Sequence, residues 1–442
     1  MLYRVLSDYF SIQHLKSLPS AELQDIQIKR LRHIVKHAWL NVPYYSKKMK
    51  ELGMTPDDIV TLEDLARLPT TSKSELASEK HDEMIAQNMQ PKGCTSRNTT
   101  GTTGKPTTVL WSGEYADYIT ALRFVNTKRL GIRLTEKVIS VEFHGVRDNA
   151  IDEEASSRSI DLRKIRKFLY GPWVAPALIT LRWKRVGFRK SVSEISDVIV
   201  NYKPAGIYSR PSYLRELGAA LESKAQKLNI RKALLSGEVI SETCRRDIQN
   251  YFGCETFESY GAEELGSIAI ECSAHQGLHV QPHLIVEVIK DGQNVGSGER
   301  GEVVITNLGN SLMPLIRYRL GDIVEMMPKE SCRCGSESHR ILKVYGRKQD
   351  ILVRGDGCKV YSRDLLDMLE ATLGFRDFQI EQKESGDLAV RLPADRATNV
   401  AKISIANVLK GVLGSEANIS WETWNAESRP VKYRPIFSRI AA

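Results

Sequence analysis

The chain of 442 residues lacks any uninterrupted apolar run of the about 18 residues that a membrane-spanning helix needs. Its first residues, Met1–Asp8, lack the basic-then-apolar order of a secretory signal peptide. The seven cysteines are an odd number in a long chain, which argues against a disulfide framework and for reduced thiols. Together these absences predict a cytoplasmic protein without a membrane span.

A strong charge of one sign is also missing. Lys plus Arg number 63 against 54 Asp plus Glu, and the net charge of +9 is spread along the sequence. The sequence has no interleaving of aromatic and basic residues, and the basic stretches 163–169 and 182–190 are typical of solvated faces. We therefore expect no nucleic-acid partner. The mild basic excess fits polyanionic small molecules at least as well.

The sequence does have ample apolar material, 42% of its residues, in a length typical of two or three domains. Apolar residues at helical spacing predict helices over 21–53, interrupted near Pro43, and over 72–86 behind the capping residues Thr71 and Ser72. From about residue 95, short β-branched runs alternate with helical stretches, which favours a largely parallel sheet. The predicted fold class is α/β.

Later segments have a different pattern. Strands dominate 279–326, where Asp291-Gly292 between two apolar runs is typical of a hairpin and predicts antiparallel pairing. After residue 346 the order strand, turn, strand, helix and strand predicts a small α+β unit. We predict a large N-terminal domain with mixed and parallel sheets over 1–345, including a helical lead-in over 1–90, and a small C-terminal domain over 346–442.

The sharpest local signal is a loop of hydroxyl residues, glycines and a lysine, Thr99-Thr100-Gly101-Thr102-Thr103-Gly104-Lys105, followed by Pro106. Such a loop can wrap phosphates with N–H, O–H and ammonium donors. It is not a Walker loop, which has four residues between its glycines and Ser or Thr after the lysine. A polar linker can have the same composition, so the loop alone leaves both interpretations open.

Four further clusters carry polar chemistry. Glu258–Gly266 joins an aromatic ring that can stack on a purine to carboxylates that can hold Mg²⁺, although a strand-end acidic turn is the simpler interpretation. Arg317–Asp322 ends in a carboxylate that could accept a ribose diol or form a surface ion pair. Gly346–Asp350 and Lys432–Arg434 complete the set.

In order and spacing these pieces resemble the adenylate-forming superfamily of acyl-CoA ligases, adenylation domains and luciferases. The resemblance is strongest to the phenylacetate–CoA ligase-like branch and its capsule-biosynthesis relatives. It is supported by the passages Arg30–Tyr45, Leu62–Pro69, Ser236–Glu238 and Asp356–Val360. The resemblance covers essentially the whole chain. It implies a large domain that binds ATP and an acid, and a small mobile C-terminal lid.

The resemblance also implies two half-reactions, in which a carboxylate attacks the α-phosphate of ATP and a thiol then takes the acyl group. It implies that the Thr/Gly loop and Lys105 hold the β- and γ-phosphates, and that Glu264 holds Mg²⁺. Asp322 would bind the ribose, and Lys432 would bridge the carboxylate and the α-phosphate. The other implied nucleotide contacts are Ser236, Gly237, Glu238, Ser259, Tyr260 at the adenine face, Gly261 and Arg347.

Three positions depart from the family pattern. Glu263 stands where Thr or Ser usually precedes the metal-binding glutamate, Gln349 stands at the hinge where Asp or Lys is common, and Val431 replaces the glycine before Lys432. An additional carboxylate beside phosphates weakens triphosphate binding unless a cation offsets it. None of the three departures removes a catalytic group, so together they allow a specialised or slow enzyme.

A possible metal site is marked by Cys332-Arg333-Cys334, which places two thiols on one turn, as suits Zn²⁺. Cys272 and His279 lie upstream, and in some relatives the matching residues resemble a structural zinc site. His275 is the local alternative to His279, and buried thiols without metal are the alternative to zinc. With four protein ligands such a site would be structural.

The sequence therefore predicts an ATP-dependent, AMP-forming carboxylate ligase that activates an organic acid, with aryl acids among the candidates, and passes it to CoA. A carrier-protein thiol or an amine, as in polysaccharide tailoring, is the alternative acceptor. A degenerate nucleotide-binding scaffold is the alternative from another class. The expected cofactors and partners are ATP and AMP, Mg²⁺, structural Zn²⁺, CoA, a small carboxylic acid and, from the family, a second copy in a homodimer.

Overall fold

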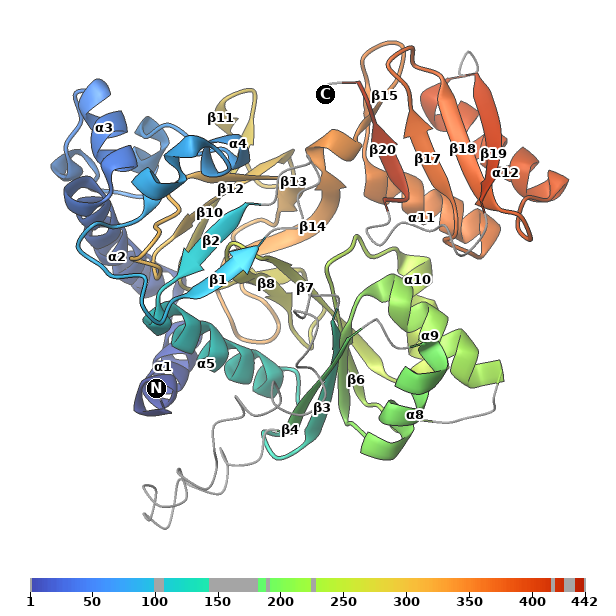
Figure 1. Ribbon diagram of the computed structural model, residues 1–442, viewed down its shortest axis with the longest axis horizontal. Coiled ribbons are helices and arrows are strands. Elements are labelled where there is room, and N and C mark those ends of the chain that lie inside the picture. Colours follow the sequence, from blue (N-terminus) through green and yellow to red (C-terminus); the bar gives the residue numbers. More distant parts are fainter. Residues whose placement is uncertain are drawn as a thin grey trace.

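The computed structural model describes residues 2–98, 107–142, 182–187, 191–223, 228–414, 418–424 and 434–440. Within them, a twelve-stranded sheet runs through the large N-terminal part and a separate four-stranded sheet forms the C-terminal part (Figure 1). Helices cover both sheets, so the predicted α/β fold class is confirmed. None of the described helices is both long and apolar enough to cross a bilayer.

The N-terminal segment is mainly helical. It forms α1 (Leu2–Ser17), α2 (Ser20–Asn41), α3 (Pro43–Glu51) and α4 (Lys73–Leu76), with 3₁₀ turns at η1 (Pro56–Asp58), η2 (Glu63–Arg67) and η3 (Glu79–Met84). The predicted interruption at Pro43 is confirmed, because proline can begin a helix but cannot continue one. Ser72 caps α4 as predicted: its hydroxyl accepts from the Glu75 N–H, and the Glu75 carboxylate accepts from the Ser72 N–H.

One half of the large sheet is parallel. It contains β3 (Lys137–Glu142), β4 (Arg182–Gly187), β5 (Gly206–Ser209), β6 (Lys232–Ser236) and β7 (Glu255–Ala262), in the order β4-β3-β5-β6-β7. The helices α8 (Val192–Tyr202), α9 (Pro211–Ser223) and α10 (Glu242–Phe252) lie together on one side of these strands (Figure 1). Ile199, Leu217 and Ile248 of the helices pack against Ile207 and Leu235 of the strands in one apolar core. The predicted strand–helix alternation is thus confirmed.

The other half of the sheet is antiparallel. It contains β8 (Gly266–Glu271), β9 (Leu278–Val280), β10 (Leu284–Lys290), β11 (Gln293–Asn294), β12 (Arg300–Asn307), β13 (Tyr318–Met326) and β14 (Arg340–Arg347). The predicted turn at Asp291-Gly292 is present, with φ of +51 and +83 as a two-residue hairpin requires. It leads into the short β11, however, and the second apolar run, β12, pairs with the opposite edge of β10.

Three more elements lie between the lead-in and the parallel strands. β1 (Thr95–Asn98) and β2 (Thr108–Trp111) form a separate two-stranded ribbon, and α5 (Gly113–Arg129) follows. Helix α1 packs against α5 (Figure 1). The first helix of the chain is therefore joined to the large sheet through α5.

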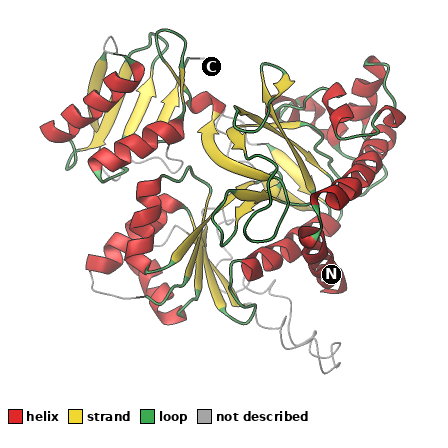
Figure 2. Cartoon of the chain, turned by 180° about the vertical axis from the view of Figure 1, so that it is seen from behind, coloured by secondary structure: helices red, strands yellow, loops and turns green. Residues whose placement is uncertain are grey.

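The C-terminal part has its own sheet and core. After η5 (Lys348–Asp350) come β15 (Leu352–Val353), β16 (Lys359–Val360), α11 (Ser362–Leu373), β17 (Gln379–Gln382), β18 (Leu388–Pro393), α12 (Asn399–Leu413), β19 (Ile419–Trp424) and β20 (Ile436–Ser438). The sheet order is β19-β18-β17-β20, and α11 and α12 cover the same face of it (Figure 2). We propose that the division between the two domains falls at the end of β14, beside Gly346.

Helix α11 holds the C-terminal part against the large one. The Asp367 carboxylate accepts from the N–H of Glu242 at 3.0 Å, and the Glu370 carboxylate accepts from the hydroxyl of Ser241 at 2.6 Å. Both carboxylates therefore lie at the N-terminus of α10, where unpaired N–H groups favour negative charge.

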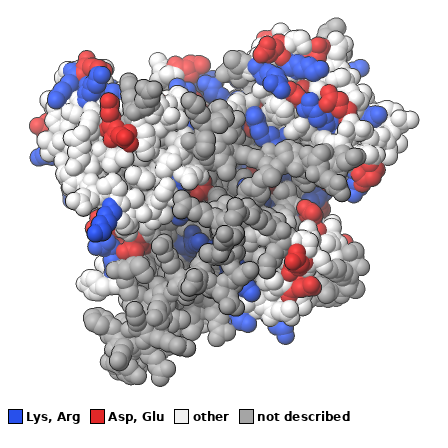
Figure 3. Space-filling view, in the orientation of Figure 1, with Lys and Arg blue, Asp and Glu red and all other residues white. Residues whose placement is uncertain are grey.

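The surface of the C-terminal part has mixed charge. Basic and acidic side chains are intermingled there in the space-filling view (Figure 3). Arg391, for example, pairs with both Glu381 and Glu422 at 2.7 Å. This fits the spread-out charge seen in the sequence.

Candidate functional site

A cleft lies where the carboxyl ends of β6 and β7 meet β13, β14 and the C-terminal part. It has about 1170 Å³ of empty space, part of it open to solvent. The carboxyl ends of parallel strands are where open α/β sheets bind their ligands. Of the nucleotide contacts expected from the sequence, those that line the cleft are Gly237, Glu238, Ser259, Tyr260, Gly261, Asp322 and Arg347.

Three of these residues form a polar network around a buried carboxylate. Tyr260 donates its hydroxyl hydrogen to Oδ2 of Asp322 at 2.7 Å, and Nε of Arg347 lies 2.8 Å from Oδ1 of the same carboxylate. Asp322 and Arg347 stand directly opposite each other in the β13–β14 ladder. Asp322 is only 6% exposed, whereas the Arg347 side chain is 35% exposed, so the carboxylate of this ion pair is buried in the cleft and the guanidinium reaches solvent.

Burial and the network shift the pKa of each member. The pKa of Asp322 is raised, because the effect of burial exceeds the lowering by Arg347 and by the Tyr260 hydroxyl. The pKa of Tyr260 lies well above its ordinary value, because the phenol is buried and a phenolate would face Asp322. Asp322 in turn raises the pKa of Arg347. Each Asp322 oxygen keeps a second lone pair that could accept from a ligand hydroxyl.

The turn after β6 closes one side of the cleft. Ser236 ends β6 opposite Ser259 of β7, and Gly237 follows with φ +86. The Glu238 carboxylate accepts from the N–H and the hydroxyl of Ser212 at 3.2 and 2.9 Å. Glu238 therefore lines the cleft but is also tied to the start of α9.

Glu264 lies on the hairpin between β7 and β8, outside the cleft lining. This hairpin is a strand-end turn, and it is tight: a Cβ on Gly261 would lie 2.7 Å from the carbonyl oxygen of Gly266. The Glu264 side chain is buried; it accepts from the Tyr318 hydroxyl at 3.1 Å and lies 3.5 Å from Nζ of Lys73. Sequence reasoning missed Lys73, whose only signal was its place after a capping serine.

The C-terminal part adds a second ion pair to the cleft. Arg434 pairs with Asp350, and both line the cleft. Burial raises the pKa of Asp350, and Arg434 lowers it. The sequence marked both segments but gave neither residue a role. Lys432 and the loop Thr99–Lys105 lie outside the described residues, so their roles stay predictions.

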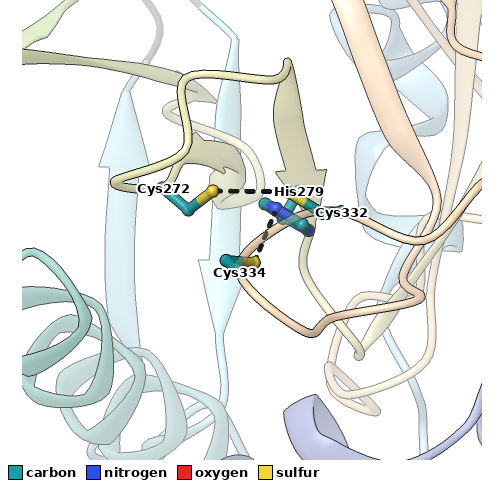
Figure 4. Close-up of side chains that lie close together, drawn as sticks. All are labelled: Cys272, His279, Cys332 and Cys334. Atoms are coloured by element: carbon teal, nitrogen blue, oxygen red, sulfur yellow. Dashed lines mark hydrogen bonds between the residues drawn. The ribbon is translucent and has the colours of Figure 1, made fainter.

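The cysteine and histidine side chains singled out in the sequence do come together (Figure 4). Cys272 follows β8, His279 lies in β9, and Cys332 and Cys334 lie in the loop between β13 and β14. Their ligand atoms all lie within 4.8 Å of one another, and we call these four residues the Cys/His cluster. His275 lies outside it, with its ring against two carboxylates at 3.0 and 3.1 Å.

The geometry of the Cys/His cluster fits a four-coordinate metal. Sγ of Cys272 lies 3.6 Å from Sγ of Cys332, and Sγ of Cys334 lies 3.5 Å from Nε2 of His279. Sulfur ligands of a tetrahedral zinc ion lie roughly 3.8 Å apart. Ser338 Oγ lies 2.7 Å from His279 Nδ1, which leaves Nε2 toward the thiols. Burial lowers the pKa of His279 to about 3, so the ring is neutral at pH 7, as a ligand must be.

Among known proteins, the chain is similar to curated phenylacetate–coenzyme A ligases. No protein-family model matches it. It is 27% identical to the phenylacetate–coenzyme A ligase of Pseudomonas putida over 340 residues, which are 75% of this chain and 72% of that protein. It is 25% identical to the phenylacetate–coenzyme A ligase of Escherichia coli K12 over 342 residues, with the same 75% and 72% covered.

Solved CoA ligases share the fold. 2-Hydroxyisobutyryl-CoA ligase with 2-HIB-AMP in the postadenylation state has a TM-score of 0.78 at 19% identity, covering 96% of this chain and 91% of that chain. The same ligase with 2-HIB-AMP and CoA in the thioesterification state has a TM-score of 0.65 at 20% identity, covering the same 96% and 91%. Taken together, the similarity in sequence and the shared fold support the adenylate-forming superfamily, and within it the phenylacetate–CoA ligase-like branch.

Proposed function

We propose that the chain is an ATP-dependent, AMP-forming ligase that activates an organic acid as an acyl-adenylate and passes the acyl group to CoA. The observation that carries the proposal is the polar network of Tyr260, Asp322 and Arg347 in a cleft of about 1170 Å³. The similarity to phenylacetate–coenzyme A ligases, and to a CoA ligase holding 2-HIB-AMP, supports this type of reaction. Aryl acids are candidate substrates.

Attack of a carboxylate on the α-phosphate of ATP brings two anions together, so the site must neutralise charge more than move protons. In this proposal Asp322 accepts from the ribose hydroxyls, Tyr260 lies against the adenine, and Arg347 contacts the nucleotide from the side of the C-terminal part. Lys432 bridges the attacking carboxylate and the α-phosphate, a transient contact that suits an ammonium. The loop Thr99–Lys105 holds the β- and γ-phosphates.

Glu264 is the proposed Mg²⁺ ligand. In phosphoryl-transfer sites Mg²⁺ takes one or two carboxylates together with substrate phosphates, and Glu264 offers a carboxylate. When bound, the ion would neutralise the charge of the triphosphate. Tyr318 and Lys73 hold the Glu264 carboxylate. Lys73 is also a cation that could offset the additional carboxylate of Glu263.

The Cys/His cluster is the proposed site of a structural zinc ion. Three thiolates and one imidazole are a complete set of four ligands, which leaves no open position for chemistry. The ion would fasten the loop that carries Cys332 and Cys334 to the ends of β8 and β9. Since β8 pairs with β7, which carries Tyr260, zinc would support one wall of the cleft.

Pyrophosphate release with MgATP tests the ligase proposal across aryl, fatty, hydroxy and amino acids, with and without CoA. The expected result is release with one class of acid, increased by CoA. Asp322→Asn should lower that release, whereas Asp291→Asn, at an exposed turn, should not. Release that CoA leaves unchanged would point to a carrier-protein thiol or an amine as acceptor. Nucleotide binding without release for any acid would contradict the ligase and favour a scaffold.

A further inference from the structure

Helices α1 and α5 bring basic side chains beside the Cys/His cluster. A small cavity of about 320 Å³ of empty space adjoins the cluster. Lys16 of α1 and Arg129 of α5 line this cavity together with Cys272 and His279. The proposed ligase reaction uses neither basic residue, so their position needs another reason.

Lys16 has a partner that does not neutralise its charge. Its ammonium donates to Oδ1 of Asn126 at 2.7 Å, and Asn126 is buried at the face of α5. An amide oxygen is a neutral acceptor. Lys16 is partly buried, and burial lowers the pKa of its ammonium well below the ordinary value. A nearby negative charge would stabilise the charged form.

Two other cations also contact the cluster or its loops. Nη2 of Arg129 donates to Sγ of Cys334 at 3.9 Å. Arg340 is 4% exposed and stands opposite the ligand histidine in the β14–β9 ladder. Its Nη1 and Nη2 donate to the carbonyl oxygens of Gln276 and Glu330 at 2.7 and 2.8 Å. Those carbonyls belong to the two loops that carry the cysteines.

Within the part of the chain that the structure describes, no carboxylate oxygen lies within 4.0 Å of a side-chain nitrogen of Lys16, Arg129 or Arg340. Glu271 also lines the cavity, but its carboxylate lies 3.0 Å from Arg245 and is already engaged there. Three neutral thiols and a neutral imidazole carry no charge that could offset these cations. Zinc with three thiolates and an imidazole carries one net negative charge, which offsets part of the positive charge of these three side chains.

We propose that Lys16, Arg129 and Arg340 are the charge partners of a three-thiolate zinc centre. They strengthen metal binding by stabilising its net negative charge, and they make α1 part of the metal site. This deepens the zinc proposal, on which it rests, and does not depend on the ligase reaction. A purely structural role for Lys16 and Arg129 would be to pack α1 against α5.

The two roles predict opposite effects on the metal-free protein. If the cations serve the charged centre, removing one relieves an uncompensated positive charge, so the metal-free variant melts at or above the metal-free wild type. If they only pack the helices, the variant melts lower with or without metal. Melting temperatures measured with zinc and with a chelator therefore separate the roles.

The experiment uses the full chain and the variants Lys16→Met and Arg129→Gln, with zinc affinity measured by competition with a chromophoric chelator. Each variant should bind zinc about tenfold more weakly or worse, the usual loss when a residue that supports metal ligands is changed. Arg129→Lys keeps the charge and should retain most of the affinity. Lys128→Gln removes an exposed charge from the same turn of α5 and should leave affinity unchanged.

Unchanged zinc affinity in both variants would overturn the inference while leaving the zinc site intact, provided that wild type binds about one zinc per chain. Equal destabilisation of the variants with and without metal would also overturn it, because packing alone would explain that result. Wild-type protein that binds no zinc would contradict the zinc proposal and this inference together, without bearing on the ligase.

Discussion

The cleft and the Cys/His cluster both lie beside the twelve-stranded sheet, but the charges of their side chains are balanced differently. In the cleft Asp322 faces Arg347 and Asp350 faces Arg434, so each of these two aspartates has its own cation. Beside the cluster, Lys16 and Arg129 have no carboxylate within 4.0 Å among the residues described. A site neutralised by its own side chains can bind a substrate and release it. A site with excess charge of one sign needs a permanent partner.

The greatest loss of activity is expected from a substitution that removes a cation from the cleft. Lys432→Ala should lower acid-dependent adenylation about 10²–10³-fold, because one cation at the developing charge is lost. ATP binding, measured by calorimetry, should stay largely intact. Lys410→Ala, on an exposed position of α12, is the matched control. Adenylation by Lys432→Ala at the wild-type rate would show that the lysine assignment is wrong.

The second prediction concerns metal binding by the Cys/His cluster. The double variant Cys332→Ser, Cys334→Ser should lose bound zinc, as measured by elemental analysis of protein purified without added metal. A site filled at 1,000 times its Kd stabilises the fold by about 4 kcal/mol, so the variant should also melt lower. Cys358→Ser, at an exposed cysteine, should keep the metal. Near-stoichiometric zinc in the double variant would refute the site.

A third prediction concerns the two neighbouring carboxylates next to the cleft, Glu263 and Glu264. Glu264→Gln should raise the Mg²⁺ concentration needed for half-maximal pyrophosphate release about tenfold, which corresponds to about 1.4 kcal/mol. Glu263→Gln removes the neighbouring carboxylate and should tighten ATP binding, because it lowers repulsion with the phosphates. If both variants shift the Mg²⁺ requirement equally, Glu264 has no special part in holding the ion.

The smallest expected effect is on the stability of α4, the helix that places Lys73 beside Glu264. Burial tends to raise the pKa of Glu75, but hydrogen bonds from Lys48 and Ser72 lower it to about 2, below the ordinary 4.5. A carboxyl whose pKa is depressed in the folded state adds stability above its unfolded pKa, and this stability is lost as pH falls toward the folded value. Glu75→Gln should therefore lower the melting temperature at pH 7.

That loss should be modest, because Glu75 is 35% exposed and solvent screens its ion pair to about 1 kcal/mol or less. In melting curves recorded from pH 7 down toward pH 3, the difference from wild type should stay nearly constant down to about pH 5 and then shrink. A difference that stays constant over this range would mean that the Glu75 charge contributes nothing.

The sequence predicted most of the fold where the signals are local. Pro43 breaks a helix and Ser72 caps one through contacts with near neighbours, and the parallel half of the sheet follows from strand–helix alternation. The pairing of β12 with the far edge of β10 was not predicted. A turn such as Asp291-Gly292 fixes which residues reverse direction, but strand order depends on long-range packing.

The candidate functional sites were also predictable from the sequence only where their signals are local. The motifs that include Asp322 and Glu264 are short and were found by their order in the sequence. Their partners come from elsewhere: Lys73 reaches Glu264 from a distant helix, and Arg434 reaches Asp350 from near the C-terminus. Nothing near Lys16 in the sequence marks it as a neighbour of a cysteine. Contacts across the fold are visible only once the elements are placed.

Acid-dependent exchange of labelled pyrophosphate into ATP, measured without CoA, is the decisive test of adenylate formation at the cleft. An adenylate-forming ligase reverses its first half-reaction, so exchange should need the acid and Mg²⁺, and Asp322→Asn should strongly reduce it. Exchange that appears only when CoA is present, or that Asp322→Asn leaves at the wild-type rate, would contradict the adenylate mechanism at the cleft.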